Sequence, residues 1–236
     1  MQNLKNKRIN RCLLCGQSKL RNIFSLGNLY ISNFVNKKEI NQGLRAPLSL
    51  MYCYKCTLIQ LSHIAPQELM YKKFYWYKSG INKTMRDELK DLYRATLKKI
   101  KLKKDDVILD IGANDGTLLR YFNKNITIGC EPAKNLTSSL KKNCKYVIRD
   151  FWDKKHFFKI IKKQKLKKAK IITAIGMFYD LENPNKFISD AAESLTDDGI
   201  FIAQLMCLKS MLIKNDVGNI CHEHLEFYSF KSLKYL

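Results

Sequence analysis

Short apolar runs alternate with helical stretches over the second half of the chain, and this alternation limits the fold more than any other feature. The first run, 107–112, ends in glycine and leads into the helical pattern of 117–122. Strands that alternate with helices form a parallel sheet. The sequence therefore predicts an α/β fold with a doubly wound, mostly parallel, Rossmann-like sheet. Further strands are expected at 126–130, 146–148, 171–174 and 200–203, with helices from about 135 and at 155–163.

Three other segments complete the expected elements. Apolar residues at three-and-four spacing predict a helix over 82–100. Asn183 and Pro184 have the residue types of a helix start, since Asn caps a first turn and Pro fits inside it. Residues 196–199 read as a turn before the last strand, and 230–236 read as a helix.

The loop after the first strand, residues 110–116 with the sequence Asp-Ile-Gly-Ala-Asn-Asp-Gly, is called the glycine loop here. In open parallel sheets, ligands bind at the carboxyl ends of the strands. A nicotinamide site favours G-x-G-x-x-G, whereas only two glycines are present and two aspartates would repel a pyrophosphate. An acidic loop suits the cationic amine and sulfonium of S-adenosylmethionine. The expected cofactor-binding residues of the loop are Asp110, Gly112, Asn114, Asp115 and Gly116.

Three residues after the next strands extend this expected cofactor site. Glu131 ends the second strand, where a carboxylate can accept hydrogen bonds from both ribose hydroxyls. Asp150 and Phe151 follow the third strand and could bind the adenine amino group and stack on its ring; the alternative is that they are ordinary turn residues. The glycines and acids at this spacing together favour S-adenosylmethionine over a ligand-free turn.

Two C-x-x-C pairs stand near the N-terminus and predict a structural zinc site. The pairs are Cys12 with Cys15 and Cys53 with Cys56. Two thiolates on each of two tight turns complete a tetrahedron with no open position for water. The long spacing between the pairs implies an inserted strand or loop. Disulfides are the less favoured alternative, because the chain lacks an apolar signal peptide or spanning segment and a cytoplasmic location is expected.

His222, Glu223 and His224 lie near the end of the chain in an order that is not H-E-x-x-H, which excludes a zinc-protease helix. A histidine with an ordinary pKa suits a general base that removes a proton beside a ketone, and a neighbouring carboxylate such as Glu223 could orient it. Packing is the alternative role. The aromatic segment 71–80 includes Tyr75 and Tyr77, which could donate to an enolate oxygen or could simply pack.

These motifs occur in an order that resembles the zinc-binding-domain-containing sugar C-methyltransferases. The resemblance rests on the cysteine pairs, 75–77, 110–116, 177–184 and 222–224. It implies a class I S-adenosylmethionine-dependent methyltransferase that adds a methyl group beside the ketone of a nucleotide-linked deoxysugar, with His224 as the base. Some relatives carry His where this chain has Asp180, and often a carboxylate at the position of Gln204. The implied domains are a zinc-binding domain at 1–70, an aromatic linker and leading helix at 71–104, and a methyltransferase domain at 105–236 that is expected to be incomplete at its C-terminus.

The net charge of +22 raises the question of a phosphate-bearing partner. Lysines occur in every segment, so the charge alone does not select a substrate. One alternative function is an RNA methyltransferase with a zinc module, although 175–180 lacks an Asn-Pro-Pro-aromatic pattern. Another is a non-catalytic fragment that binds zinc and cofactor. A nucleotide-linked sugar is the expected partner, with no membrane and no nucleic acid.

Overall fold

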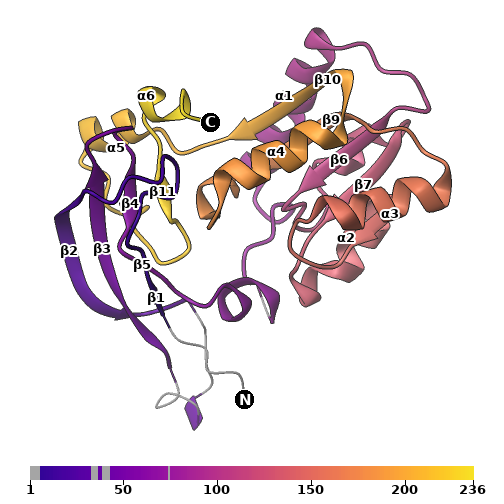
Figure 1. The fold of residues 1–236 in the computed structure, drawn as a ribbon. Helices are drawn as coiled ribbons and strands as arrows, with labels where there is room; N and C mark the ends of the chain where they lie inside the picture. The colour runs from indigo at the N-terminus through magenta and orange to yellow at the C-terminus, as the bar shows by residue number, and fades with distance from the viewer. Residues whose placement is uncertain (1–5, 33–36, 39–42, 74) are drawn as a thin grey trace. The chain divides into compact units, whose positions relative to one another are not determined.

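The computed structural model describes residues 6–32, 37–38, 43–73 and 75–236 and divides the chain into two compact units (Figure 1). Unit 1 comprises residues 1–70, 177–186 and 205–236, and unit 2 comprises 71–176 and 187–204. The C-terminal residues 205–236, which the sequence places with the methyltransferase domain, therefore cluster with the first seventy residues.

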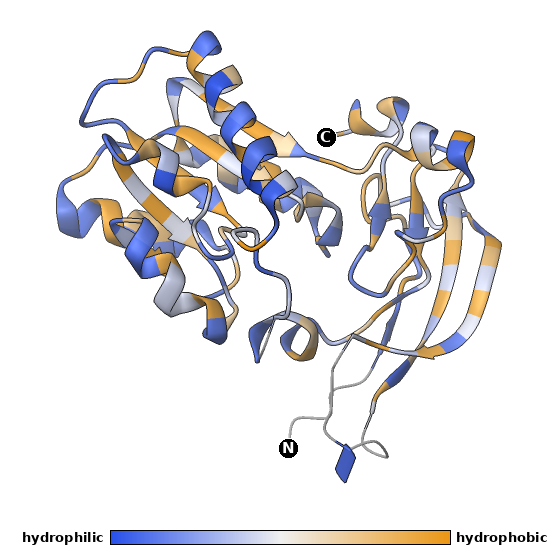
Figure 2. Cartoon of the chain, turned by 180° about the vertical axis from the view of Figure 1, so that it is seen from behind, coloured by the Kyte–Doolittle hydropathy of each residue, from blue (hydrophilic) through white to orange (hydrophobic). Residues whose placement is uncertain are grey.

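A five-stranded parallel sheet forms the centre of unit 2, as the alternation of strands and helices predicts. Its strand order is β10-β9-β6-β7-β8, and every neighbouring pair is parallel. The chain starts in the middle, builds to one side and then returns to build the other side, which is the doubly wound arrangement. Figure 2 shows hydrophobic colour running along these strands. The strands are β6 (Val107–Ile111), β7 (Ile126–Cys130), β8 (Tyr146–Ile148), β9 (Ala169–Ile175) and β10 (Leu195–Gln204).

Two of the helices around this sheet, α1 and α3, begin at a side-chain cap. The side chain of Asn82 accepts a hydrogen bond at the start of α1, and that of Asp153 does so at the start of α3. Apolar residues of α1, α2 and the segment 118–122 pack on Ile108 and Ile171 in one core cluster. The elements are α1 (Lys83–Lys99), η3 (Leu119–Phe122), η4 (Lys134–Leu136), α2 (Thr137–Asn143), α3 (Lys154–Gln164) and α4 (Pro184–Ser194).

Three sequence expectations need correction. The helix expected at 117–122 is only the short 3₁₀ helix η3, since the N–H of Tyr121 bonds to the carbonyl of Leu118, three residues before it, which is the 3₁₀ pattern. The turn expected at 196–199 lies inside β10 as a register shift between Leu195 and Ile200. The last helix ends at Leu233 rather than 236.

Unit 1 contains a four-stranded sheet of order β11-β4-β3-β2, in which all pairs are antiparallel. Strand β11 comes from the C-terminal segment and pairs with β4, so Glu226 faces Gln60 in the register. Leu48 and Leu61 share one core cluster with Leu208 and Phe227. The elements are β1 (Lys7–Arg8), β2 (Leu20–Tyr30), β3 (Arg45–Cys53), β4 (Ile59–Leu61), β5 (His63–Ile64), η5 (Phe178–Asp180), α5 (Leu208–Lys214), β11 (Glu226–Phe227) and α6 (Phe230–Leu233).

The helix η2 (Glu68–Lys72) carries the chain from unit 1 into unit 2. Within the described ranges, none of the helices is both long enough and apolar enough to cross a membrane.

Candidate functional site

The glycine loop leaves β6 through three residues with positive φ. Gly112, Asn114 and Gly116 have φ values of 73°, 51° and 80°. Glycine adopts such backbone freely, and asparagine tolerates it better than most residues. A Cβ at Gly116 would lie 2.7 Å from the Cβ of Asn143 in α2. The tight turn brings the backbone N–H groups of residues 112–114 toward the end of β7.

Glu131 directly follows β7, as the sequence predicts, and its carboxylate binds the backbone of the glycine loop. Its Oε2 accepts a hydrogen bond from the N–H of Asn114 at 2.9 Å, and its Oε1 accepts one from the N–H of Ala133 at 2.8 Å. The side chain is buried, and burial raises the pKa of its carboxyl although both backbone donors lower it. A carboxylate offers about four acceptor positions, so two remain for a ligand.

Asp110 lies within β6, and its side chain faces the neighbouring strand β9. The hydroxyl of Thr173 donates to its Oδ1 at 2.6 Å. Burial raises the pKa of Asp110 to about 7, and the nearby charge of Glu131 acts in the same direction. The carboxyl therefore sits deep under the loop rather than at its surface.

Asn114 and Asp115 both accept hydrogen bonds from the segment that precedes α1. The Oδ1 of Asn114 accepts from the N–H of Ser79 at 3.0 Å, and the Oδ2 of Asp115 accepts from the N–H of Gly80 at 2.9 Å. The other oxygen of Asp115 accepts from Thr117, through its N–H at 3.1 Å and its hydroxyl at 2.6 Å. Both expected cofactor residues thus hold the protein's own backbone, a role that sequence reasoning missed.

Asp150 and Phe151 follow β8, and both contact Lys72. The Nζ of Lys72 lies 3.1 Å from Asp150 Oδ1 and 5.7 Å from the centre of the Phe151 ring. Partial burial alone would raise the pKa of Asp150, but the hydrogen bonds from Lys72 and from the Phe151 N–H prevail, and the pKa is lowered. Nothing in the sequence signals the role of Lys72, because it lies 78 positions from Asp150.

The four cysteines of the C-x-x-C pairs converge in unit 1, and their sulfurs all lie within 4.8 Å of one another. Cys12 pairs with Cys56 and Cys15 with Cys53, each with 3.5 Å between the Sγ atoms. Zn–S bonds of about 2.3 Å in a tetrahedron place sulfurs about 3.8 Å apart, so this set fits zinc. Among the described residues, no other group of three or more His, Cys, Asp or Glu side chains lies close enough to hold a metal.

The two cysteine turns have the same backbone form. In each, the residue after the second cysteine donates its N–H to the carbonyl of the first at 2.9 Å, from Gly16 to Cys12 and from Thr57 to Cys53. Both donors have positive φ, 70° and 63°. The insertion between the turns is strand β2 and most of β3, as the long spacing requires.

His224 lies in unit 1 beside Tyr179, with ring centres 4.8 Å apart. Its Nδ1 is 2.8 Å from the carbonyl oxygen of Asn219. Because a carbonyl only accepts, Nδ1 carries the proton and Nε2 keeps its lone pair. Burial lowers the pKa of His224, while the nearby charge of Glu223 acts to raise it.

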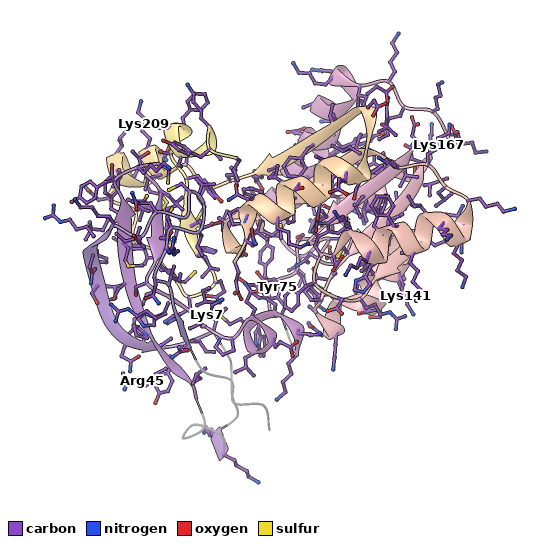
Figure 3. All side chains as sticks on the ribbon, viewed as in Figure 1. Lys7, Arg45, Tyr75, Lys141, Lys167 and Lys209 are labelled. Atoms are coloured by element: carbon purple, nitrogen blue, oxygen red, sulfur yellow. The ribbon has the colours of Figure 1, made fainter. Side chains whose placement is uncertain are left out.

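The remaining expected catalytic residues, Tyr75 and Tyr77, belong to unit 2. Tyr75 is labelled in Figure 3. Its ring lies 5.7 Å from that of Tyr71, and its backbone pairs with the side chain of Asn135. Burial raises the pKa of Tyr77, with a further contribution from the charge of Asp115. The expected catalytic set is therefore divided between the two units, whereas all expected cofactor residues share unit 2.

Comparison with known proteins gives two family matches. Residues 81–236 match the family described as "Methyltransferase domain", and residues 12–71 match the family described as "Putative zinc binding domain". The C-methyltransferase NovU of Streptomyces niveus is 21% identical over 229 residues, which cover 95% of this chain and 54% of that protein. The chain thus spans about half the length of this curated relative.

The solved structures that this chain matches include several methyltransferases. The mycolic acid cyclopropane synthase CmaA1, complexed with SAH and CTAB, is 18% identical with a TM-score of 0.46, covering 71% of this chain and 65% of its own. A SAM-dependent methyltransferase from Geobacter sulfurreducens in complex with S-adenosyl-L-homocysteine is 17% identical with a TM-score of 0.39, covering 54% and 50%.

The family match includes β6 to β10, the glycine loop and Glu131, where the cofactor-binding residues are expected. The chain belongs to the methyltransferase domain family.

Proposed function

We propose that the chain is an S-adenosylmethionine-dependent C-methyltransferase that acts on a nucleotide-linked keto-deoxysugar through an enolate. The observation that carries the proposal is the position of Glu131, which closes the glycine loop at the carboxyl ends of β6 and β7. Ligands of doubly wound sheets bind at this edge, beside the point where the strand order reverses.

The residues at this edge suit an adenosyl cofactor. Glu131 retains acceptor capacity for the ribose hydroxyls, and Asp150 offers its second oxygen to the adenine amino group. Phe151 supplies a ring for stacking. The cofactor supplies an electrophilic methyl group on a sulfonium, whose positive charge suits a site with Asp110 and Glu131 nearby. The same acids disfavour a pyrophosphate.

His224 is the proposed general base. Its tautomer leaves Nε2 as an acceptor, and its lowered pKa keeps the ring neutral at pH 7. It removes a proton from the carbon beside the ketone; the proton stays on Nε2 and the C–H electron pair enters the enolate. Glu223 stabilises the imidazolium that forms, because its charge favours the protonated ring.

Tyr75 and Tyr77 are the proposed donors to the enolate oxygen. The raised pKa of Tyr77 means that its phenol keeps its proton at neutral pH and can donate a hydrogen bond. The zinc site has a structural role in this proposal, because four thiolates leave no position for water or substrate.

The C-methyl chemistry draws support from the relative NovU, whose name states that activity, and the sugar class from the resemblance of motifs. The test is incubation of zinc-loaded protein with methyl-labelled cofactor and a set of nucleotide-linked 4-keto-deoxysugars in D₂O. We expect deuterium at the carbon beside the ketone without cofactor, and a new carbon-bound methyl with it.

His224→Gln should lose both signals, whereas His63→Gln, a change in the short strand β5, should retain them. Label that enters added RNA instead of a sugar would contradict the proposal and favour an RNA methyltransferase.

A further inference from the structure

The segment that precedes α1 is bonded to the ends of three neighbouring strands of the unit 2 sheet. We call residues 71–80 the strap; Phe74 lies outside the described residues. The strap's three anchors all lie within unit 2.

The first anchor is the glycine loop after β6. Besides accepting from Ser79 at 3.0 Å, Asn114 donates from Nδ2 to the carbonyl of Tyr77 at 3.1 Å. Gly80 approaches so closely that a Cβ there would lie 2.6 Å from Asp115 Oδ2. Asn114 therefore satisfies both a donor and an acceptor of the strap backbone, and a side chain at Gly80 would force the carboxylate of Asp115 to shift.

The second anchor is Asn135 in η4, a few residues after β7. Its Oδ1 accepts from the N–H of Tyr75 at 2.9 Å, and its Nδ2 donates to the carbonyl of the same residue at 2.9 Å. The amide pairs with Tyr75 as a neighbouring strand would. An aspartate could accept but could not donate, so the anchor requires an amide.

The third anchor is Asp150 after β8, which binds Lys72 at 3.1 Å. The ammonium also lies near the Phe151 ring. As the chain runs from Lys72 through Tyr75 to Gly80, it crosses the ends of β8, β7 and β6 in that order. The strap thus passes the adenine, ribose and methionine positions of the proposed cofactor in turn.

We infer that the strap forms a wall of the cofactor site, and that Asn135 is a positioning residue that holds this wall. The inference rests on the proposed function. A ligand that contacts the docked strap binds only the fraction of molecules in which the strap is docked, so its apparent affinity falls with that fraction. By the same linkage, the bound ligand stabilises the docked strap.

The test compares Asn135→Ala and Asn135→Asp with the wild type by calorimetric titration with S-adenosylhomocysteine. Loss of two hydrogen bonds in Asn135→Ala should weaken binding about tenfold, and Asn135→Asp should also weaken it because it lacks the donor. The matched control is Asn125→Ala. Asn125 lies just before β7, at the end of the strand opposite to Asn135, and its side chain donates one hydrogen bond to the carbonyl of Lys103. This control should bind like the wild type.

Hydrogen exchange supplies a second measurement that a general loss of stability would not reproduce. Saturating S-adenosylhomocysteine should slow exchange of the Tyr75, Ser79 and Gly80 amides in the wild type, with a smaller effect in Asn135→Ala. Exchange in the strands of the sheet should be similar in both proteins.

Two results separate the inference from the proposed function. If the wild type and Asn135→Ala bind equally well, the strap is not a wall of the cofactor site, although the site itself is supported. The same conclusion follows if the wild type binds and the exchange of the strap amides does not change with ligand. If the folded wild type does not bind, both are overturned.

Discussion

The carboxylate of Glu131 accepts a hydrogen bond from the backbone N–H of Asn114, with 2.9 Å between the two atoms. This bond joins the end of β7 to a residue held at a φ of 51° in the glycine loop. One side chain therefore fixes the loop and also lies where the ribose of the proposed cofactor would bind. A change at Glu131 should therefore alter both the shape of the glycine loop and the binding of the proposed cofactor.

Asp110 is expected to make the stability of unit 2 depend on pH. Its pKa is about 7 in the fold against 3.8 when exposed, so between these values the folded state binds more protons than the unfolded state. Stability should therefore fall as pH rises from about 4 to about 7, by at most about 4 kcal/mol for this group. Urea denaturation of Asp110→Asn across this range should show a smaller fall than the wild type.

The control for this prediction is Asp105→Asn, just before the opposite end of β6. Lys167 hydrogen-bonds to Asp105 and lowers its pKa, so its titration lies below the tested range. An Asp110→Asn protein with the same pH dependence as the wild type would show that Asp110 is ionised throughout.

Zinc should bind with one equivalent per chain and stabilise unit 1. Structural zinc sites contribute about 10–16 kcal/mol of binding free energy, and removing one of the four ligand thiolates should remove part of it. Cys56→Ser should release its metal to a chelator at a concentration that leaves the wild type loaded, as measured by mass spectrometry of the metal. Cys144→Ser, which changes a half-buried thiol of unit 2, should remain loaded. Equal metal retention by both variants would rule out the four-cysteine site.

The imidazole of His224 should titrate below pH 6.5, because burial lowers its pKa more than Glu223 raises it. Between the folded pKa and 6.5 the unfolded state binds more protons, so this group's contribution to stability should grow as pH rises. The chemical shift of its ring C–H proton, assigned with His224→Gln, measures the midpoint. A midpoint above 6.5 would contradict the buried environment.

Gly116→Ala should destabilise the parallel sheet by more than its backbone conformation alone explains. The positive φ costs about 1–2 kcal/mol, and the clash with Asn143 should add about 1–3 kcal/mol. Gly27→Ala separates the two costs, because its φ is +82° and its Cβ would meet nothing within 4 Å. Hydrogen exchange of the β6 amides in Gly116→Ala and of the β3 amides in Gly27→Ala gives the loss of unfolding free energy in each variant. Equal losses would mean that α2 moves away without cost.

The sequence predicts the parts of this fold that depend on local patterns. The run at 107–111 is apolar except for Asp110, as suits a strand buried along its whole length, and the position of Glu131 is predicted because it directly follows the next such strand. The cysteine pairs are found because each turn is complete within four residues. Local chemistry and tertiary structure agree at these positions.

Other features depend on contacts between distant residues and leave no local pattern. The sequence does not mark Asn135 or Lys72, because their roles depend on contacts with distant residues. Asn135 binds Tyr75, and Lys72 binds Asp150. Strand β11 is two residues long, so its pairing with β4, which brings the C-terminal segment into unit 1, cannot be read from periodicity. The helical pattern at 117–122 does not reveal that η3 is a 3₁₀ helix, because 3₁₀ and α-helices have similar apolar spacing over a single turn.

The most direct test of the central claim is calorimetric titration of zinc-loaded protein with S-adenosylmethionine, repeated with Glu131→Gln. Glutamine has one acceptor oxygen where glutamate has two, so only some of the backbone N–H groups and ribose hydroxyls keep an acceptor. Hydrogen bonds to charged groups contribute about 1.5–3 kcal/mol each. Glu193→Gln, an exposed carboxylate paired with Lys154, is the control. We predict saturable binding by the wild type and the control and about tenfold to a hundredfold weaker binding by Glu131→Gln. Folded wild-type protein that does not bind, or a Glu131→Gln variant that binds equally well, would contradict the account.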